Sequence, residues 1–336
     1  MRSAPPEDVE TGAVIDVLAE HWGFDVEAAD YAALGAGSYH WEVTDKTGLR
    51  GFVTVDDLDQ KPWLGDARDA AFDGLRRAFD TSVALRGGGL HFVVAPIPTR
   101  QGESLRRLDS RYAIALFPFV AGEAGQFGWI EDDGDRRSVV AMLAELHQAT
   151  AAVGSAVRSV GLDLPGRHHL EAALLERDEA WSGGPLSEPA RNAVRDSASE
   201  LIELLTLADR LAAEAEKRGD GWVVTHGEPH AGNIMRTSEG RVLVDWDTVG
   251  LAPPERDLWM LVVGGADAAD LYVGATGTQL NEAALDFFRL TWDLKDLAEY
   301  LNVFRSPHQE DDDTVRQYQA LKDSAALRED WTALLE

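Results

Sequence analysis

Two short segments of this chain carry side chains whose types and spacing suit phosphoryl transfer. The first is His226-Gly-Glu-Pro-His-Ala-Gly-Asn233, and the second, Asp245-Trp-Asp247, begins twelve residues after that asparagine. Phosphoryl transfer needs a carboxylate that orients the attacking hydroxyl, and an asparagine and a second carboxylate that hold the magnesium ions bridging the phosphates. The two segments supply these residue types, with several carboxylates and the asparagine Asn233.

Two short predicted strands, residues 222–225 and 241–244, must position these side chains. Each strand ends where the polar residues begin, so both groups can converge on one point. Elsewhere after residue 121 the hydrophobic spacing is helical. The predicted helices of this part are 135–152, 168–181, 188–217, 280–304 and 312–334.

The first 120 residues show a different pattern, in which strand-like alternation dominates. Helices are predicted at 14–22 and 66–86, and strands at 31–34, 38–43, 52–55, 91–95 and 112–117. A mostly antiparallel sheet lobe over residues 1–120 and a helical lobe over residues 121–336 together predict an α+β chain of two domains.

A glycine-bearing turn, Leu34-Gly-Ala-Gly-Ser-Tyr39, lies between two of the predicted strands. Glycines let backbone amides approach phosphate oxygens closely, so Gly35, Gly37 and Ser38 are candidates for nucleotide binding. The turn is not a dinucleotide-binding fingerprint, because a strand follows it where that fingerprint requires a helix.

The composition limits the partners that the protein can bind. There are 31 basic and 59 acidic side chains, a formal net charge of −28, and no cysteine. Such a charge repels nucleic acid and anionic membranes and attracts cations, although it also simply keeps a protein soluble. Without cysteine there are no disulfides, thiol nucleophiles or thiolate metal ligands. With no apolar run of membrane-spanning length and no signal-like start, we expect a cytoplasmic protein.

The catalytic segments resemble those of the aminoglycoside phosphotransferase family, relatives of the protein kinases. The likeness rests on His230-Ala-Gly-Asn233, Val244-Asp-Trp-Asp247 and Ala252-Pro-Pro-Glu-Arg-Asp-Leu258, with the N-terminal helix and the glycine turn, and covers nearly the whole chain. The pattern is nearest the spectinomycin phosphotransferase type. The resemblance implies a two-lobed, protein-kinase-like fold with a small antiparallel-sheet N-lobe and a larger, mainly helical C-lobe.

The same resemblance implies roles for individual residues. Glu228 corresponds to the catalytic aspartate, and His226 braces its loop while Asp257 holds it from behind. Asn233 and Asp245 correspond to the Mg²⁺ ligands, with Asp247 as a further candidate. The residues expected near the nucleotide are Gly35, Gly37, Ser38, Phe117, Phe119 and Val120, with Leu34 and Val53 as further lining of the adenine cleft.

This chain departs from the family pattern at two positions. Glu228 stands where the family has aspartate, which moves the carboxylate by roughly 1 to 1.5 Å. Thr54 stands where the family has a phosphate-binding lysine, and the following helix has no glutamate to pair with one. Neither lysine of the first lobe, Lys46 or Lys61, is on that strand. We therefore expect an arginine of the helix to replace the lysine, with Arg68, Arg76 and Arg77 as candidates.

The function these features favour is transfer of the γ-phosphoryl group of ATP or GTP, with Mg²⁺, to a hydroxyl of a small cationic molecule such as an aminocyclitol. Acidic side chains that could attract such an acceptor are Asp267, Asp270 and those of residues 310–313. Two alternatives remain. One is a degenerate kinase-like fold that binds a nucleotide or small molecule without transfer, suggested by Thr54 and Glu228. The other is a metabolic kinase for a small alcohol.

Overall fold

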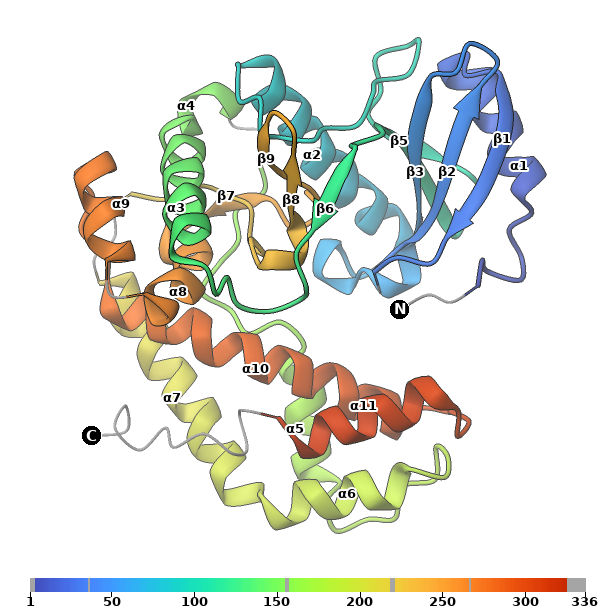
Figure 1. Cartoon of the computed structure of the whole chain (residues 1–336). Helices are drawn as coiled ribbons and strands as arrows, with labels where there is room; N and C mark the ends of the chain where they lie inside the picture. The colour runs from blue at the N-terminus through green and yellow to red at the C-terminus, as the bar shows by residue number, and fades with distance from the viewer. Residues whose placement is uncertain (1–3, 36, 155–156, 218–220, 266, 325–336) are drawn as a thin grey trace. The chain divides into compact units, whose positions relative to one another are not determined.

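The computed structural model of this chain describes residues 4–35, 37–154, 157–217, 221–265 and 267–324 (Figure 1). The chain forms two compact units. The first comprises Met1–Val160 and Trp222–Thr278, and the second comprises Gly161–Gly221 and Gln279–Glu336. The boundary predicted at residue 120 falls inside the first unit, which therefore holds both the sheet and the catalytic segments.

An antiparallel sheet with the strand order β1-β2-β3-β5-β4 forms the N-terminal part of the first unit (Figure 1). Two helices accompany it, α1 (Thr11–Val17, continued by a π-helical turn, Leu18–Trp22) and α2 (Arg68–Gly87). Two 3₁₀ turns, η2 (Leu58–Gln60) and η3 (Pro62–Leu64), connect the sheet to α2. The strands are β1 (Val26–Ala32), β2 (Tyr39–Asp45), β3 (Arg50–Asp57), β4 (Arg106–Arg107) and β5 (Tyr112–Pro118).

The two faces of this sheet bury different side chains, because successive residues of a strand point to opposite sides. Val53 and Val55 of β3 pack with Val14 and Leu18 on the α1 side. Ala113, Ala115 and Phe117 of β5 pack with α2 on the other side. Since Phe52 is opposite Phe117 in the pairing, the residues of β3 that face the α2 side are Phe52, Thr54 and Asp56.

The described residues in the rest of the first unit form two small sheets and four α-helices. One sheet has the order β6-β8-β9, and the other pairs β10 with β7. The strands are β6 (Gly122–Ala124), β7 (Val223–Thr225), β8 (Ile234–Thr237), β9 (Gly240–Leu243) and β10 (Gly250–Ala252). The helices are α3 (Asp133–Gln148), α4 (Thr150–Val153), α8 (Glu255–Gly264) and α9 (Ala268–Thr276), with a 3₁₀ turn, η5, at Ala231–Asn233.

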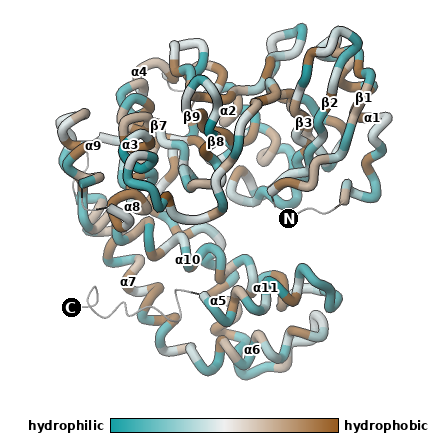
Figure 2. The backbone as a smooth tube through the Cα atoms, in the orientation of Figure 1, coloured by the Kyte–Doolittle hydropathy of each residue, from teal (hydrophilic) through white to brown (hydrophobic). Residues whose placement is uncertain are grey.

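The second unit is helical. Its helices are α5 (Arg167–Leu175), α6 (Ser187–Asp196), α7 (Ala198–Glu216), α10 (Glu282–Arg305) and α11 (Asp312–Lys322). Figure 2 shows hydrophobic and hydrophilic residues alternating along α7 and α10. The buried leucines of α7 recur every three or four positions, so one face of the helix is apolar. They include Leu201, Leu204, Leu207 and Leu211.

Most predicted elements are present, and several boundaries were wrong. The strand expected at 91–95 is absent; only Val93 forms an isolated bridge, to Leu243. The helix expected at 188–217 is two helices that meet at Ser197, and the one expected at 168–181 ends at Leu175. Residues 325–334 of the last predicted helix lie outside the described residues. Strands β6, β8 and β10 and helices α8 and α9 were not predicted. No helix in the described part of the chain is both long and apolar enough to cross a membrane.

Candidate active site

The β8–β9 hairpin brings the two catalytic segments together. Ile234 and Leu243 are opposite each other in this hairpin, so Asn233, just before β8, lies across from Val244, just after β9. The Val244 amide donates to the Asn233 carbonyl over 3.0 Å, and the side chain of Asn233 donates to the Glu228 carbonyl over 2.9 Å. The loop that carries Glu228 is thereby tied to the start of the Asp245 segment.

His226 links the same segments through its imidazole ring. The Glu228 amide donates to Nδ1 over 3.2 Å, so Nδ1 carries no proton, and Nε2 lies 2.9 Å from the Val244 carbonyl, to which it donates. Burial lowers the pKa of His226, in agreement with this neutral tautomer. The hydrogen bonds that the resemblance implied for His226 are therefore present.

Asp257, on α8, holds the loop from behind. Its carboxylate accepts from the amides of His226 over 2.7 Å and Gly227 over 2.6 Å, and His147 of α3 lies 3.1 Å from it. The second ring nitrogen of His147 is 2.8 Å from the Tyr272 hydroxyl. Burial alone would raise the pKa of Asp257, but the contact with His147 and the nearby cations outweigh it and hold that pKa below its usual value.

Gly227 is required by the close approach of Arg256. This glycine has φ of +103°, and a Cβ added to it would lie 2.3 Å from an Arg256 nitrogen. Arg256 donates to the Thr225 hydroxyl over 2.8 Å and to the Thr248 carbonyl over 3.0 Å. Its guanidinium therefore fills the space beneath the catalytic loop, where a side chain at position 227 would not fit.

The three predicted metal ligands supply the oxygen donors that Mg²⁺ prefers. Within the described ranges no three His, Asp or Glu side chains form a ready metal cluster, and the predicted set relies on the amide of Asn233. Asp245 has φ of +65°, the only positive value for a non-glycine residue in the described chain, a conformation that costs about 1–3 kcal/mol. Functional sites are where such strain concentrates.

The charges around Asp245 also suit a cation. Its carboxylate makes no hydrogen bond or ion pair within the part of the chain that the structure describes, and its residue is exposed on one side. The surrounding protein withdraws water from the carboxyl group, and Asp247 and Glu228 repel its charge, so its pKa is raised. A divalent cation would relieve that repulsion, so these residues fit Mg²⁺.

Lys61 lies in this site, which corrects the expectation that an arginine replaces the lysine missing at Thr54. Its Nζ is 2.7 Å from Asp247 Oδ2 and 2.9 Å from Asp56 Oδ1, and the side chain is 1 % exposed. Burial alone would lower the pKa of Lys61, but Asp247 and Asp56 outweigh it and raise that pKa above its usual range. The Thr54 hydroxyl contacts the same Asp56 over 3.4 Å.

The arginines that we expected to replace the lysine are engaged elsewhere or lie on the surface. Arg68 forms an exposed ion pair with Asp59, and Arg76 lies within ion-pair distance of Asp73 and Asp80 on its own helix. Arg77 is exposed. In the sequence Lys61 lies between Leu58 and Leu64, which are both buried in the structure.

The glycine turn approaches this lysine. The Ser38 hydroxyl donates to Asp56 over 2.5 Å and lies 3.5 Å from Lys61 Nζ. Gly35 has φ of +64°, and Gly37 has open space where a Cβ would be; Ala36 lies outside the described residues. The predicted phosphate-binding turn, the lysine and the Asp245–Asp247 segment therefore meet at one place.

The expected lining of the adenine cleft is partly wrong. Phe117 belongs to a buried cluster, and Phe52, Val120, Val242 and Val244 pack against that cluster. Val53 points to the opposite face of the sheet, because the strand alternates, and Leu34 is 51 % exposed. The ring of Phe119 is covered by the guanidinium of Arg50, 3.4 Å from the ring centre. Phe52 faces the same side of the sheet as Phe117, where we had expected Val53. The alternation of side chains along the strand was the available indication.

Several of the acidic residues expected to attract an acceptor form helix caps or ion pairs. Asp311 caps α11 in a capping box, and Asp313 pairs with Arg316. Asp267 pairs with Arg137.

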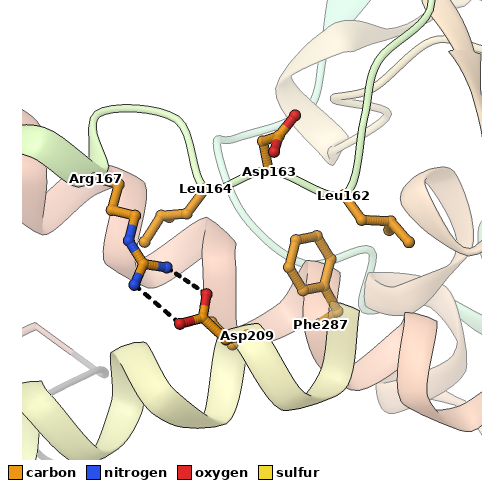
Figure 3. Close-up of a pocket in the computed structure, with 7 residues that line it drawn as sticks. Leu162, Asp163, Leu164, Arg167, Asp209 and Phe287 are labelled. Atoms are coloured by element: carbon orange, nitrogen blue, oxygen red, sulfur yellow. Dashed lines mark hydrogen bonds and ion pairs between the residues drawn. The ribbon is translucent and has the colours of Figure 1, made fainter. Parts of the chain in front are cut away.

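The second unit has a pocket of about 170 Å³ (Figure 3), with the Arg167–Asp209 ion pair at its edge. It is lined by Leu162, Asp163, Leu164, Arg167, Ala208, Asp209 and Phe287. Small-molecule sites usually measure about 300–1,000 Å³, so this pocket alone does not define an acceptor site.

An antiparallel sheet and a hairpin followed by two acids, which meet at the buried Lys61, resemble the site of phosphotransferases with a kinase-like α+β fold. Residues 33–300 match the phosphotransferase enzyme family (APH), so the chain belongs to that family and is a small-molecule phosphotransferase. Protein StrN of Streptomyces griseus is 29 % identical over 269 residues, which cover 77 % of this chain and 79 % of StrN.

Two solved structures share the fold. The spectinomycin phosphotransferase APH(9)-Ia, in complex with ADP and spectinomycin, superposes with a TM-score of 0.71 at 17 % identity and covers 94 % of this chain and 95 % of its own. A microcompartment-associated aminopropanol kinase has a TM-score of 0.62 at 18 % identity, covering 96 % and 98 %. The predicted two-lobed, kinase-like fold class is confirmed.

Proposed function

We propose that this protein transfers the γ-phosphoryl group of ATP or GTP, with Mg²⁺, to a hydroxyl of a small cationic acceptor. The observation that carries the proposal is the position of Lys61, buried between Asp56 and Asp247 and 3.5 Å from Ser38. The degenerate alternative rested partly on a missing phosphate-binding lysine, and Lys61 removes that reason. The net charge of −28 supports a cationic acceptor.

In this proposal Glu228 orients the acceptor hydroxyl and receives its proton while the oxygen attacks the γ-phosphorus. The new P–O bond forms as the bond to the bridging oxygen breaks, and the nucleoside diphosphate leaves. Lys61 and the amides of the glycine turn bind the phosphates. Asn233, Asp245 and Asp247 would hold magnesium, which when bound neutralises charge on the phosphate oxygens.

The proposal is tested with purified protein, Mg²⁺ and ATP or GTP against a panel of aminocyclitols, amino sugars and linear amino alcohols, with ³¹P NMR detection of the phosphorylated product. Asp245→Ala is expected to lower kcat by at least about a thousandfold, which corresponds to about 4 kcal/mol of transition-state stabilisation. Asp30→Ala, at an exposed position of β1, is the matched control and should leave kcat unchanged.

Glu228→Asp tests the position of the carboxylate independently of the loop. The backbone contacts of residue 228 remain, while the carboxylate retracts by about one bond length. We expect this variant to retain or raise activity. Nucleotide binding without transfer to any acceptor would favour the degenerate alternative. Full activity of Asp245→Ala would contradict the metal assignment.

A further inference from the structure

The loop between β6 and α3 exposes two aromatic side chains beside the catalytic loop. Among the Phe, Tyr and Trp residues that the structure describes, three are exposed: Phe127, Trp129 and Trp222. Phe127 is 72 % exposed and Trp129 is 50 % exposed. Two of the three therefore lie in one short loop, although aromatic side chains are ordinarily among the largest contributors to buried cores.

This loop is attached to the catalytic loop by several contacts. The Ala231 amide donates to the Gly128 carbonyl over 3.1 Å, and the Gly125 amide donates to the Ile234 carbonyl over 3.3 Å. The ring of Phe127 meets the ring of His230 edge-on, with centres 4.7 Å apart. His230 is two residues after Glu228, so the ring of Phe127 contacts the catalytic loop itself.

Trp129 is fixed by a different neighbour. Its ring meets that of Trp259, on α8, at 80° with centres 5.8 Å apart, and Trp259 is only 6 % exposed. Trp129 thus rests on a buried ring while half of its own surface stays in solvent. The loop continues with two exposed acids, Glu131 and Asp132, of which Asp132 caps α3, while the next acid, Asp133, pairs with Arg136.

We propose that Phe127 and Trp129 form an acceptor subsite that binds a saturated, amine-bearing ring. Aromatic faces bind the C–H surface of such rings and attract ammonium groups, which the adjacent acidic residues also favour. A saturated ring offers a whole C–H face to such side chains, whereas a two- or three-carbon amino alcohol offers little C–H surface. The inference rests on the proposed function and names the class of acceptor: a cyclitol or sugar amine.

The probes are spectinomycin and glucosamine as ring-bearing amines, and 1-amino-2-propanol and ethanolamine as linear ones. Binding is measured by tryptophan fluorescence with Mg²⁺ and ADP present, and KM and kcat by product formation. Phe127→Ala and Trp129→Ala are each expected to raise the Kd and KM of a ring-bearing probe about tenfold, a change of about 1.4 kcal/mol. Binding of ADP and kcat at saturation should not change.

Two sets of variants separate recognition from structure. Phe127→Tyr and Trp129→Phe keep an aromatic ring and should keep most of the affinity. Trp222→Ala removes the third exposed aromatic side chain and should have no effect. Unchanged affinity in both alanine variants overturns the proposal, and so does binding of the linear amines alone or of none of the probes.

The outcomes also distinguish this inference from the proposed function. If a ring-bearing probe binds, loses affinity in the alanine variants and is not phosphorylated, the proposed transfer fails and the subsite stands. If a linear amine is phosphorylated equally by the variants, transfer stands and the subsite is wrong. Self-association of the unchanged protein in sedimentation that the alanine variants lose, with Kd unchanged, would make this loop a contact between copies of the chain and would also overturn the subsite.

Discussion

The catalytic loop and the phosphate-binding side of the site lie in the same unit but are held by different interactions. The loop is fixed largely by backbone amides that donate to Asp257 and by a neutral histidine, His226. The phosphate side is fixed by buried charges, with Lys61 between Asp56 and Asp247. Hydrogen bonds to backbone fix a geometry, whereas buried charges depend on each other's presence. Removing one charged side chain from the phosphate side should therefore lower stability and nucleotide affinity. Removing a hydrogen-bond acceptor behind the catalytic loop should mainly lower kcat.

The largest difference is expected for Lys61→Met. This change removes the only cation that contacts the Asp56 carboxylate among the described ion pairs and leaves two acidic groups in a buried site. Breaking a buried pair in this way costs about 3–5 kcal/mol of stability. Loss of one electrostatic contact to the reacting phosphates should also lower kcat/KM for the nucleotide about 10²–10³-fold.

Urea unfolding and nucleotide-dependent kinetics measure both effects. Lys46→Met is the matched control, since Lys46 pairs with Asp25 on the surface and should change neither quantity. Adding Asp56→Asn to Lys61→Met should recover part of the stability, because it removes an uncompensated charge, but not the nucleotide affinity. Unchanged nucleotide kinetics in stable Lys61→Met protein would show that Lys61 does not contact phosphate.

Asp257→Asn should give a smaller effect. It should lower kcat and leave the KM for nucleotide unchanged. Amide oxygen can still accept one hydrogen bond, but the second backbone amide and His147 lose a charged partner, each worth about 1.5–3 kcal/mol. We expect kcat to fall about 10–100-fold, the usual cost of losing a supporting contact behind a site. The KM for nucleotide should not change. Asp267→Asn, at an exposed ion pair, is the control. A rise in nucleotide KM with constant kcat would contradict the separation of the two sides.

The same contrast explains which residues could be predicted from the sequence. Glu228, Asn233, Asp245 and Asp257 lie in segments whose short spacing brings them together in the fold, so their type and order were informative. Lys61 could not be placed in this way, because the 3₁₀ turn η2 separates it from β3 and only its long side chain reaches Asp56 and Asp247. Its position depends on the path of the backbone and not on a strand register.

The exposure of side chains in loops could not be predicted from the sequence either. Periodicity identifies the buried face of a helix or strand, but the loop with Phe127 and Trp129 has no periodic pattern, so nothing distinguished exposed from buried rings. The break at Ser197 within the predicted helix 188–217 was missed because a periodic pattern is present there. Helical spacing continues on both sides of the break, and only tertiary packing shows that the axis changes.

The smallest expected effect concerns pH and His40, a partly buried histidine. His40, on the phosphate side, stacks on Phe52 and has a buried Nδ1 without a hydrogen-bond partner among the described residues. Burial lowers its pKa to about 4. Because the folded state resists protonation, the unfolded chain binds the proton first as pH falls. Stability from His40 is therefore full above about pH 6.5 and is lost as the pH falls from there toward about 4.

Each such histidine contributes a slope of at most about 1.4 kcal/mol per pH unit in that window. His226 contributes in the same direction from the catalytic loop, since burial lowers its pKa too. His40→Phe should keep the stacking on Phe52. Its free energy of unfolding, measured in urea between pH 7.5 and 5, should depend less steeply on pH, by the slope that corresponds to the binding of about one proton. His91→Gln, at an exposed position, should leave the slope unchanged. An equal slope in His40→Phe would mean that the phosphate side carries no buried neutral histidine, and that the acid sensitivity belongs to the catalytic loop.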